Sequence, residues 1–161
     1  MRNDCQFSAC RRYRYSLRHE IDDLPLVGER LIMWIGLNPS TADENTLDPT
    51  LRRIRAFTLR ERGTAFVMTN LFAWRDTDPK NMMAATNPVG PENDATLLNF
   101  AAKSDLIICA WGGGGEHLGR AASVMEMLEG WNASCLGKNA DGSPRHPLYL
   151  AANTPLVPFT L

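Results

Sequence analysis

The stretch LIMWIGLNPSTAD, residues 31–43, determines the fold that we expect. A short, continuously apolar run leads there into a tight polar segment. Two further runs have the same form: AFVMT (65–69) leads into Asn70, and DLIICA (105–110) leads into Trp111 and four glycines. Such runs are typical of parallel strands buried on both faces of a sheet. Ligands bind just beyond the carboxyl ends of such strands, so we expect the three polar segments to converge on one site.

Helical segments alternate with these strands. Asp48-Pro49 supplies an N-cap and a proline suited to the first helical turn, and the helix is expected to continue through residues 51–62. The other expected elements are helices at 92–104 and 116–128, strands at 12–21, 132–136 and 148–152, and a long polar loop over 74–90. This alternation implies right-handed crossovers. It predicts an α/β three-layer sandwich around a central, mainly parallel sheet of about four to five strands.

Length and charge limit the classes of protein to consider. The 161 residues suit one α/β domain over 1–161, with residues 1–12 as a poorly ordered leader. The net charge of −1 at pH 7 excludes a globally basic nucleic-acid-binding surface. Arginines cluster over residues 11–18 and 52–55. Solvated faces are the favoured interpretation of both clusters, and a local basic patch is the alternative.

Targeting and metal-binding patterns are missing from the sequence. No apolar run approaches the ~20 residues that cross a bilayer, and the start MRNDCQFSACRRYRY has no apolar core of a secretory signal. The four cysteines form no CxxC pair, and Cys109 lies inside an apolar run. We therefore expect a reduced, cytoplasmic protein without membrane association, metal or cofactor. The sequence does not specify an oligomeric state.

The polar segment after the first strand contains two candidate catalytic residues. Pro39 fixes its own φ and holds Asn38 extended, so that the Asn38 amide can face a ligand or a water. Ser40 adds a hydroxyl, and Asp43 adds a carboxylate of the kind that orients or activates water. The same residues also suit a hydrogen-bonded turn in which Asn and Ser satisfy backbone groups.

The segment after the second strand combines an amide with aromatic rings. Asn70 offers a donor and an acceptor, which match the edge of a nucleobase. Phe72 and Trp74 are of the type that stacks on a base, and Arg75 of the type that holds a phosphate. The alternative is that both aromatic residues belong to the rim of the core and Asn70 caps a turn.

Two later segments complete the set of candidates. Trp111 precedes Gly112 and Gly113, and glycines there let the backbone approach a ligand closely or bind an anion before a helix. The run matches neither a P-loop nor a GxGxxG pattern, and a flexible turn is the alternative. Arg145 and His146 lie in a constrained, proline-flanked loop, where a histidine can stabilise developing negative charge. A structural histidine bonded to the backbone is the alternative there.

Several segments in order carry a resemblance over nearly the whole chain. They are YRYSL (13–17), IGLNPSTADENTLDPTLRRI (35–54), TNLFAWRDTDP (69–79), NPVGPENDATL (87–97), AWGGGG (110–115) and GSPRHPLYL (142–150). In these segments the chain resembles DUF1643, a family whose name carries no activity.

The order of the motifs is also similar to that of the uracil-DNA glycosylase superfamily. Residues 36–40, Gly-Leu-Asn-Pro-Ser, resemble the Gly-Ile-Asn-Pro-Gly motif of its mismatch-specific thymine/uracil branch. The resemblance implies a uracil-DNA-glycosylase-like fold, with Asn38 positioning the hydrolytic water and Asn70 recognising the base. His146 would begin the late motif of the superfamily, in which Leu148 departs from the usual serine.

The function that this resemblance implies is a nucleobase-directed hydrolase that cleaves an N-glycosidic bond. Asn38 would hold the water, Asp43 would supply basicity, and His146 would stabilise negative charge on the departing base. Two other functions fit the same residues. One is a non-catalytic nucleic-acid- or nucleotide-binding module, and the other is an enzyme that acts on free nucleotides. All three predict nucleic acid or a nucleotide as the partner.

Overall fold

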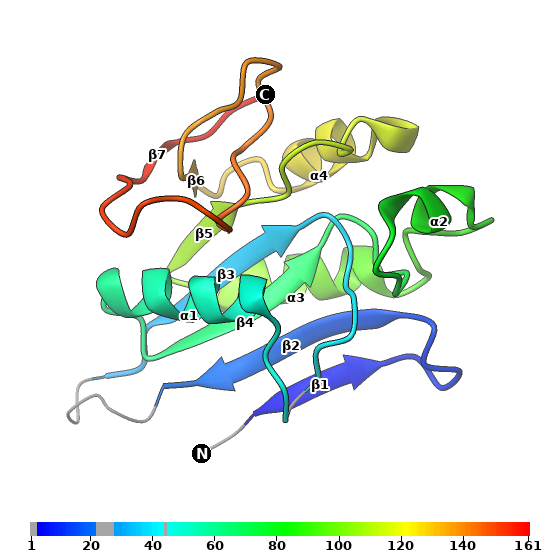
Figure 1. Cartoon of the computed structure of the whole chain (residues 1–161), viewed down its shortest axis with the longest axis horizontal. Coiled ribbons are helices and arrows are strands. Elements are labelled where there is room, and N and C mark those ends of the chain that lie inside the picture. The colour runs from blue at the N-terminus through cyan, green and yellow to red at the C-terminus, as the bar shows by residue number, and fades with distance from the viewer. Residues whose placement is uncertain (1–2, 22–27, 44) are drawn as a thin grey trace.

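The structure is a computed structural model that describes residues 3–21, 28–43 and 45–161 (Figure 1). The strands are β1 (Asp4–Phe7), β2 (Arg14–Glu20), β3 (Leu31–Gly36), β4 (Ala65–Asn70), β5 (Leu106–Cys109), β6 (Ala133–Cys135) and β7 (Val157–Pro158). The helices are α1 (Pro49–Arg60), α2 (Pro79–Ala84), α3 (Asn93–Lys103) and α4 (Arg120–Met127), with a short 3-10 turn η1 (His117–Gly119) before α4. The predicted α/β class is confirmed.

One mixed sheet organises these elements, in the strand order β1-β2-β4-β3-β5-β6-β7. The central strands β4, β3, β5 and β6 are parallel, whereas β1, β2 and β7 add antiparallel edges. The described residues thus form a sheet of seven strands, more than the four to five expected. Within the parallel part, Gly36 pairs with Asn70 and Ile35 pairs with Cys109. The polar segments after β3, β4 and β5 therefore start side by side.

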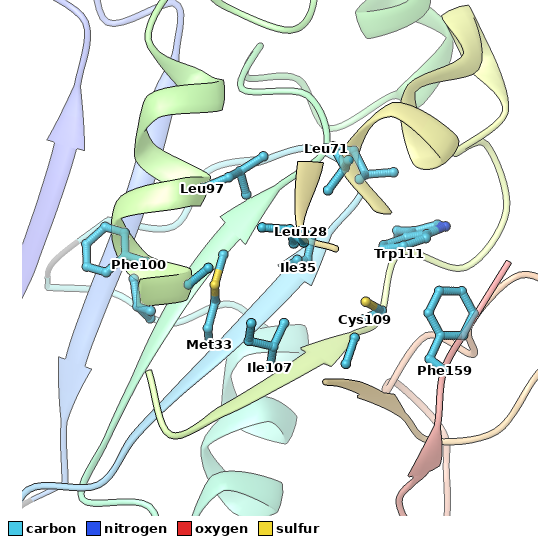
Figure 2. Packing of buried hydrophobic residues seen from close by; sticks show 14 of the residues in the cluster. Met33, Ile35, Leu71, Leu97, Phe100, Ile107, Cys109, Trp111, Leu128 and Phe159 are labelled. Atoms are coloured by element: carbon cyan, nitrogen blue, oxygen red, sulfur yellow. The ribbon is translucent and has the colours of Figure 1, made fainter. Parts of the chain in front are cut away.

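Helices cover both faces of the sheet, which gives the expected three layers (Figure 1). Strand β3 is buried along its whole length and divides its side chains between the faces with a period of two. Trp34 packs with α1, whereas Met33 and Ile35 face the cluster that contains α3 and α4. Figure 2 shows Leu97 and Phe100 of α3 in this second cluster. Two-sided burial explains why this strand is apolar throughout.

The amino-terminal edge of the sheet differs from the expectation. Residues 1–12 were expected to be a leader, yet β1 lies among them and pairs with β2. Strand β2 is therefore an internal strand and not an edge. The side chains of β1 alternate only between exposed and partly buried, so its sequence shows little hydrophobic pattern. The turn expected over residues 22–30 falls mostly outside the described residues.

Three further elements also differ from the expectation. The loop over 74–90 contains α2, which begins with the same Asp-Pro signal as α1: the Asp78 carboxylate accepts a hydrogen bond from Lys80 N at 2.9 Å. The helix expected over 116–128 is interrupted because Leu118 and Gly119 have positive φ angles. The strand expected over 148–152 is a turn, and β7 pairs with β6 instead.

Within the described parts of the chain, no helix has the length and apolar character needed to cross a bilayer.

Candidate functional site

A cavity of about 320 Å³ opens at the carboxyl ends of β3, β4 and β5. Ligand sites in open α/β sheets lie at this position. The predicted site residues that line it are Asn38, Pro39, Ser40, Asn70, Trp111, Gly112, Gly113 and His146. The structure therefore brings together residues from all three polar segments and from the late proline-flanked loop.

Asn70, the last residue of β4, is the most deeply buried polar group of this cavity. Its relative exposure is 1%, and neither side-chain polar atom has a hydrogen-bond partner among the described residues. A buried amide without partners costs about 1–3 kcal/mol. An unpaired donor and acceptor at a cavity wall are a reason to expect a ligand that supplies both partners.

Side chains from α3 and α4 hold the main chain at Asn70 and Leu71. Asn93, at the start of α3, donates from its side-chain nitrogen to the carbonyl oxygens of Asn70 and Leu71, at 3.0 and 3.1 Å. Arg120 donates from Nε to the Leu71 oxygen at 2.7 Å and forms an ion pair with Asp94 at 2.6 Å. Arg120 therefore fixes the backbone that presents Asn70.

Gly36 leaves the space that the Asn70 side chain occupies. A Cβ atom at Gly36 would lie 2.7 Å from Asn70 Oδ1 and would also overlap Met68 Cε. Because real Cβ contacts are longer, any larger residue at position 36 must displace the amide. Gly36 is therefore the glycine of this site for which close packing is decisive.

We expect Gly36→Ala to lower the free energy of unfolding by about 1–3 kcal/mol, since overpacking forces neighbouring groups to move. Thermal or urea unfolding measures this change. Gly113→Ala is the matched control, because a Cβ there meets nothing within 4 Å. Equal stabilities of the two variants would contradict the assigned packing of Asn70 over Gly36.

Asn38 lies just after β3 and connects two loops. Its amide nitrogen donates to the main-chain oxygens of Asp76 at 2.9 Å, Pro39 at 3.2 Å and Trp74 at 3.4 Å. Carbonyl oxygens only accept hydrogen bonds, so these three contacts fix which end of the amide is the nitrogen. The Asn38 oxygen is the remaining polar atom of the side chain and is available as an acceptor for a water or a ligand.

His146 lies at the mouth of the cavity. Gly112 N donates to the Pro144 oxygen at 2.9 Å, and this bond ties the loop that carries His146 to the end of β5. Leu148 N donates to His146 Nδ1 at 3.2 Å, so the proton of the neutral imidazole is on Nε2. Surrounding protein atoms lower the pKa of His146 below its ordinary 6.5, and the smaller opposing effect comes from the charge of Asp48. The ring is therefore neutral at pH 7 and donates from Nε2.

Asp48 lines the cavity, whereas Asp43 does not. The Asp43 carboxylate accepts hydrogen bonds from Asn45 N and Thr46 N within its own turn. Asp48 Oδ1 caps α1 by accepting from Leu51 N at 2.8 Å, and Oδ2 accepts from Ser40 Oγ at 3.3 Å. The sequence indicated Asp48 only as a helix cap. Asp48 also lines the cavity because α1, which it caps, starts at the edge of the cavity.

Arg14, the first residue of β2, is another charged cavity residue that was not predicted from the sequence. It is 3% exposed, donates from one terminal nitrogen to the Ala42 oxygen at 2.8 Å, and has an unpaired Nε. Burial lowers the pKa of this guanidinium, and negative charges including Asp48 partly oppose that effect. Arg14 forms no ion pair with the described residues. The arginine cluster around it was interpreted as solvated, which does not hold for this member.

Four predicted binding residues lie outside the cavity. Phe72 is fully buried in the core, where it cannot stack on a ligand. Trp74 and Arg75 line a separate groove next to the cavity. Arg145 is exposed, and its main-chain nitrogen donates to the Gly137 oxygen.

The glycine run divides into two roles. Gly112 and Gly113 line the cavity, as predicted. Gly114 and Gly115 are required for packing, since a Cβ would lie 3.1 Å from Leu37 at the first and 2.7 Å from the Trp111 indole at the second. The regular helix α4 begins only at Arg120, so its amino terminus does not directly follow the glycines.

In the described parts of the chain, no group of three or more His, Cys, Asp or Glu residues could hold a metal ion.

The fold and the site define an α/β protein with a polar cavity at the carboxyl ends of its parallel strands. The chain belongs to DUF1643, a family described as a protein of unknown function, whose model matches residues 14–148. This range begins at Arg14 and includes His146, so it covers all the residues that line the cavity. No curated protein and no solved structure matches the chain. The similarity to uracil-DNA glycosylases therefore rests on the sequence motifs alone.

Proposed function

We propose that the cavity receives a nucleobase and that the protein hydrolyses the N-glycosidic bond of that base. The observation that carries this proposal is the Asn70 amide, which is buried at the cavity wall and whose donor and acceptor find no partner among the residues that the structure describes. A nucleobase edge offers a hydrogen-bond donor beside an acceptor, which complements a carboxamide. The fold keeps this amide unsatisfied, and a base would satisfy it.

The remaining walls suit a flat, partly apolar ligand. Leu37, Met68 and Trp111 line the cavity together with the polar groups. The volume of about 320 Å³ lies at the lower end of the range of small-molecule sites. Such a cavity removes a base from water while a few polar atoms choose its orientation. The stacking role predicted for Phe72 and Trp74 is not retained, because neither residue lines the cavity.

Hydrolysis would begin with a water held by the Asn38 oxygen. The water oxygen attacks the sugar carbon, the carbon–nitrogen bond breaks, and its electron pair leaves with the base. The attacking water loses a proton, and the departing base finally gains one. Asparagine is a weak base, so Asn38 contributes positioning. In this proposal Asp48 replaces Asp43 as the carboxylate near the water, since Asp48 is the one that lines the cavity.

His146 would act on the departing base. Its neutral ring can donate from Nε2 to a base oxygen, where negative charge develops in the transition state. A donor that is already fixed by the Leu148 bond to Nδ1 needs little reorganisation when that charge develops. The motif similarity to the mismatch-specific thymine/uracil branch supports the same roles for Asn38, Asn70 and His146.

A pocket for free nucleotides is the second candidate function. Arg14 favours it, because a buried guanidinium that forms no ion pair with the described residues attracts an anionic ligand. A binding module that has lost the reaction would keep the same cavity.

The decisive experiment incubates the purified protein with oligonucleotides that contain uracil, hypoxanthine, hydroxymethyluracil or mismatched thymine, and assays for abasic sites. Tight binding without base release from any of them would reject the hydrolase and favour the module.

Asn70→Asp is expected to change which base is preferred. The substitution replaces the amide donor by a second acceptor, so a base that accepted from Asn70 would lose that contact and meet a negative charge. Loss of such a pair corresponds to about 1–3 kcal/mol of discrimination. Competition between the four bases measures the change. Asn139→Asp is the matched control, since Asn139 is exposed and does not line the cavity. An unchanged order of preference would remove Asn70 from base recognition.

A further inference from the structure

A second hollow adjoins the cavity and is lined by cationic residues. Arg11, Arg12 and Arg75 line this groove together with Trp74. Ser40 lines both the groove and the cavity, so the two hollows adjoin at this residue. A ligand whose base occupies the cavity would therefore place its next chemical group in or near the groove.

We propose that this groove binds the phosphate group attached to the nucleoside whose base enters the cavity. The inference rests on the proposed function, because the base fixes the position of the phosphate. The groove then selects a nucleotide over a nucleoside. Guanidinium groups suit phosphate because they combine charge with several hydrogen-bond donors.

The three arginines line the same groove and are linked through neighbouring rings and main-chain atoms. The guanidinium carbons of Arg11 and Arg75 lie 3.9 and 4.6 Å from the centroid of the same ring, that of Phe7. Arg75 donates to the main-chain oxygen of Arg11, and its Nε has no hydrogen-bond partner in the described parts of the chain. None of the three forms an ion pair with the described residues. Like charges fixed in this way repel one another, and a bound anion would remove the repulsion.

The described lining of the groove carries more positive than negative charge, since it holds three arginines and one aspartate. Asp76 is the acidic residue among those that line it, and Asp76 Oδ1 accepts hydrogen bonds from Asp78 N at 2.9 Å and Asn81 Nδ2 at 3.3 Å. These contacts engage its carboxylate in the start of α2. The protein as a whole carries a net charge of −1, so the groove is a local concentration of positive charge.

Binding of nucleosides and their 5′-monophosphates tests the inference. The probes are the nucleoside and the monophosphate of uracil, thymine, hypoxanthine and hydroxymethyluracil, measured by calorimetry. We expect the monophosphate of the preferred base to bind at least about tenfold more tightly than its nucleoside. Arg12→Gln and Arg75→Gln should each remove most of this advantage and leave nucleoside affinity unchanged. Arg62→Gln, at the opposite end of α1 from the cavity, is the matched control and should bind like the natural protein.

A single-stranded oligonucleotide that contains the preferred base identifies the source of the phosphate. If a strand is the substrate, its affinity should fall more steeply with salt than that of the monophosphate, and the slope should decrease by about 0.7 for each arginine removed. Equal slopes for the two ligands would assign the groove to a free nucleotide. Both results support phosphate binding.

Two outcomes separate this inference from the proposed function. Equal affinity for nucleoside and monophosphate, or affinities unaffected by both arginine substitutions, would overturn the inference while base recognition at Asn70 stood. Phosphate-dependent binding without discrimination between bases, and unchanged by Asn70→Asp, would reject the proposed function and leave the groove as an anion site.

Discussion

Asn38→Ala is expected to reduce base release by at least about 10²-fold, because the substitution removes the acceptor that holds the attacking water. Substrate affinity should change little, since Asn38 would act on the water and Asn70 on the base. Single-turnover rates with the preferred oligonucleotide separate these effects from product release. A lowered rate with unchanged affinity is the expected signature.

The amide of Asn38 also tethers the loop of Asp76, so the experiment needs a control for loop stability. Asn81→Ala removes a contact to Asp76 from a residue that does not line the cavity. That variant should retain nearly the full rate. Base release by Asn38→Ala at the rate of the natural protein would show that Asn38 has no role in the reaction.

His146→Ala is expected to slow base release by about 10²–10³-fold, as for the removal of one donor to a developing oxyanion. His146→Gln restores a donor and should recover part of the rate. The rate of the natural protein should be constant above pH 6.5 and fall at lower pH. Protonation of Nδ1 removes the acceptor of the Leu148 bond, which disturbs the placement of the ring.

The direction of the His146 pKa shift also predicts how the stability of the protein depends on pH. Because the pKa of His146 is lowered in the folded protein, protonation in the unfolded chain begins at a higher pH than in the fold. The unfolded state then binds more protons, so stability is greatest above the ordinary pKa of 6.5 and decreases as pH falls through the lowered value. Comparing urea unfolding of the natural protein and His146→Gln between pH 5 and 8 measures this contribution. If the stability of His146→Gln still decreased in the same way at low pH, the titration would belong to another group.

The central strands and α1 could be predicted from sequence, because each has a strong local signal. Strand β3 is apolar throughout since both of its faces are buried, and Asp48-Pro49 marks the start of α1. Strand β7 and helix α2 are too short for periodicity to indicate them. Strand β1 is partly exposed and depends on pairing with β2, which local sequence does not reveal.

Only those site residues that lie at the ends of the recognisable parallel strands could be predicted from the sequence. Asn38, Asn70 and Gly112 follow parallel strands, so the rule for ligand position places them together. Arg14 reaches the cavity from β2, an antiparallel strand whose neighbour in the sheet cannot be read from its sequence. Phe72 was assigned to the ligand because it follows a strand end, but the chain turns inward there and buries the ring.

The cavity combines Arg14, the first residue of β2, with His146, which follows β6 in the chain. During synthesis the amino-terminal strands emerge first, and a nascent chain that stops before His146 has every central strand but an incomplete site. Premature termination products would therefore retain much of the core without the imidazole.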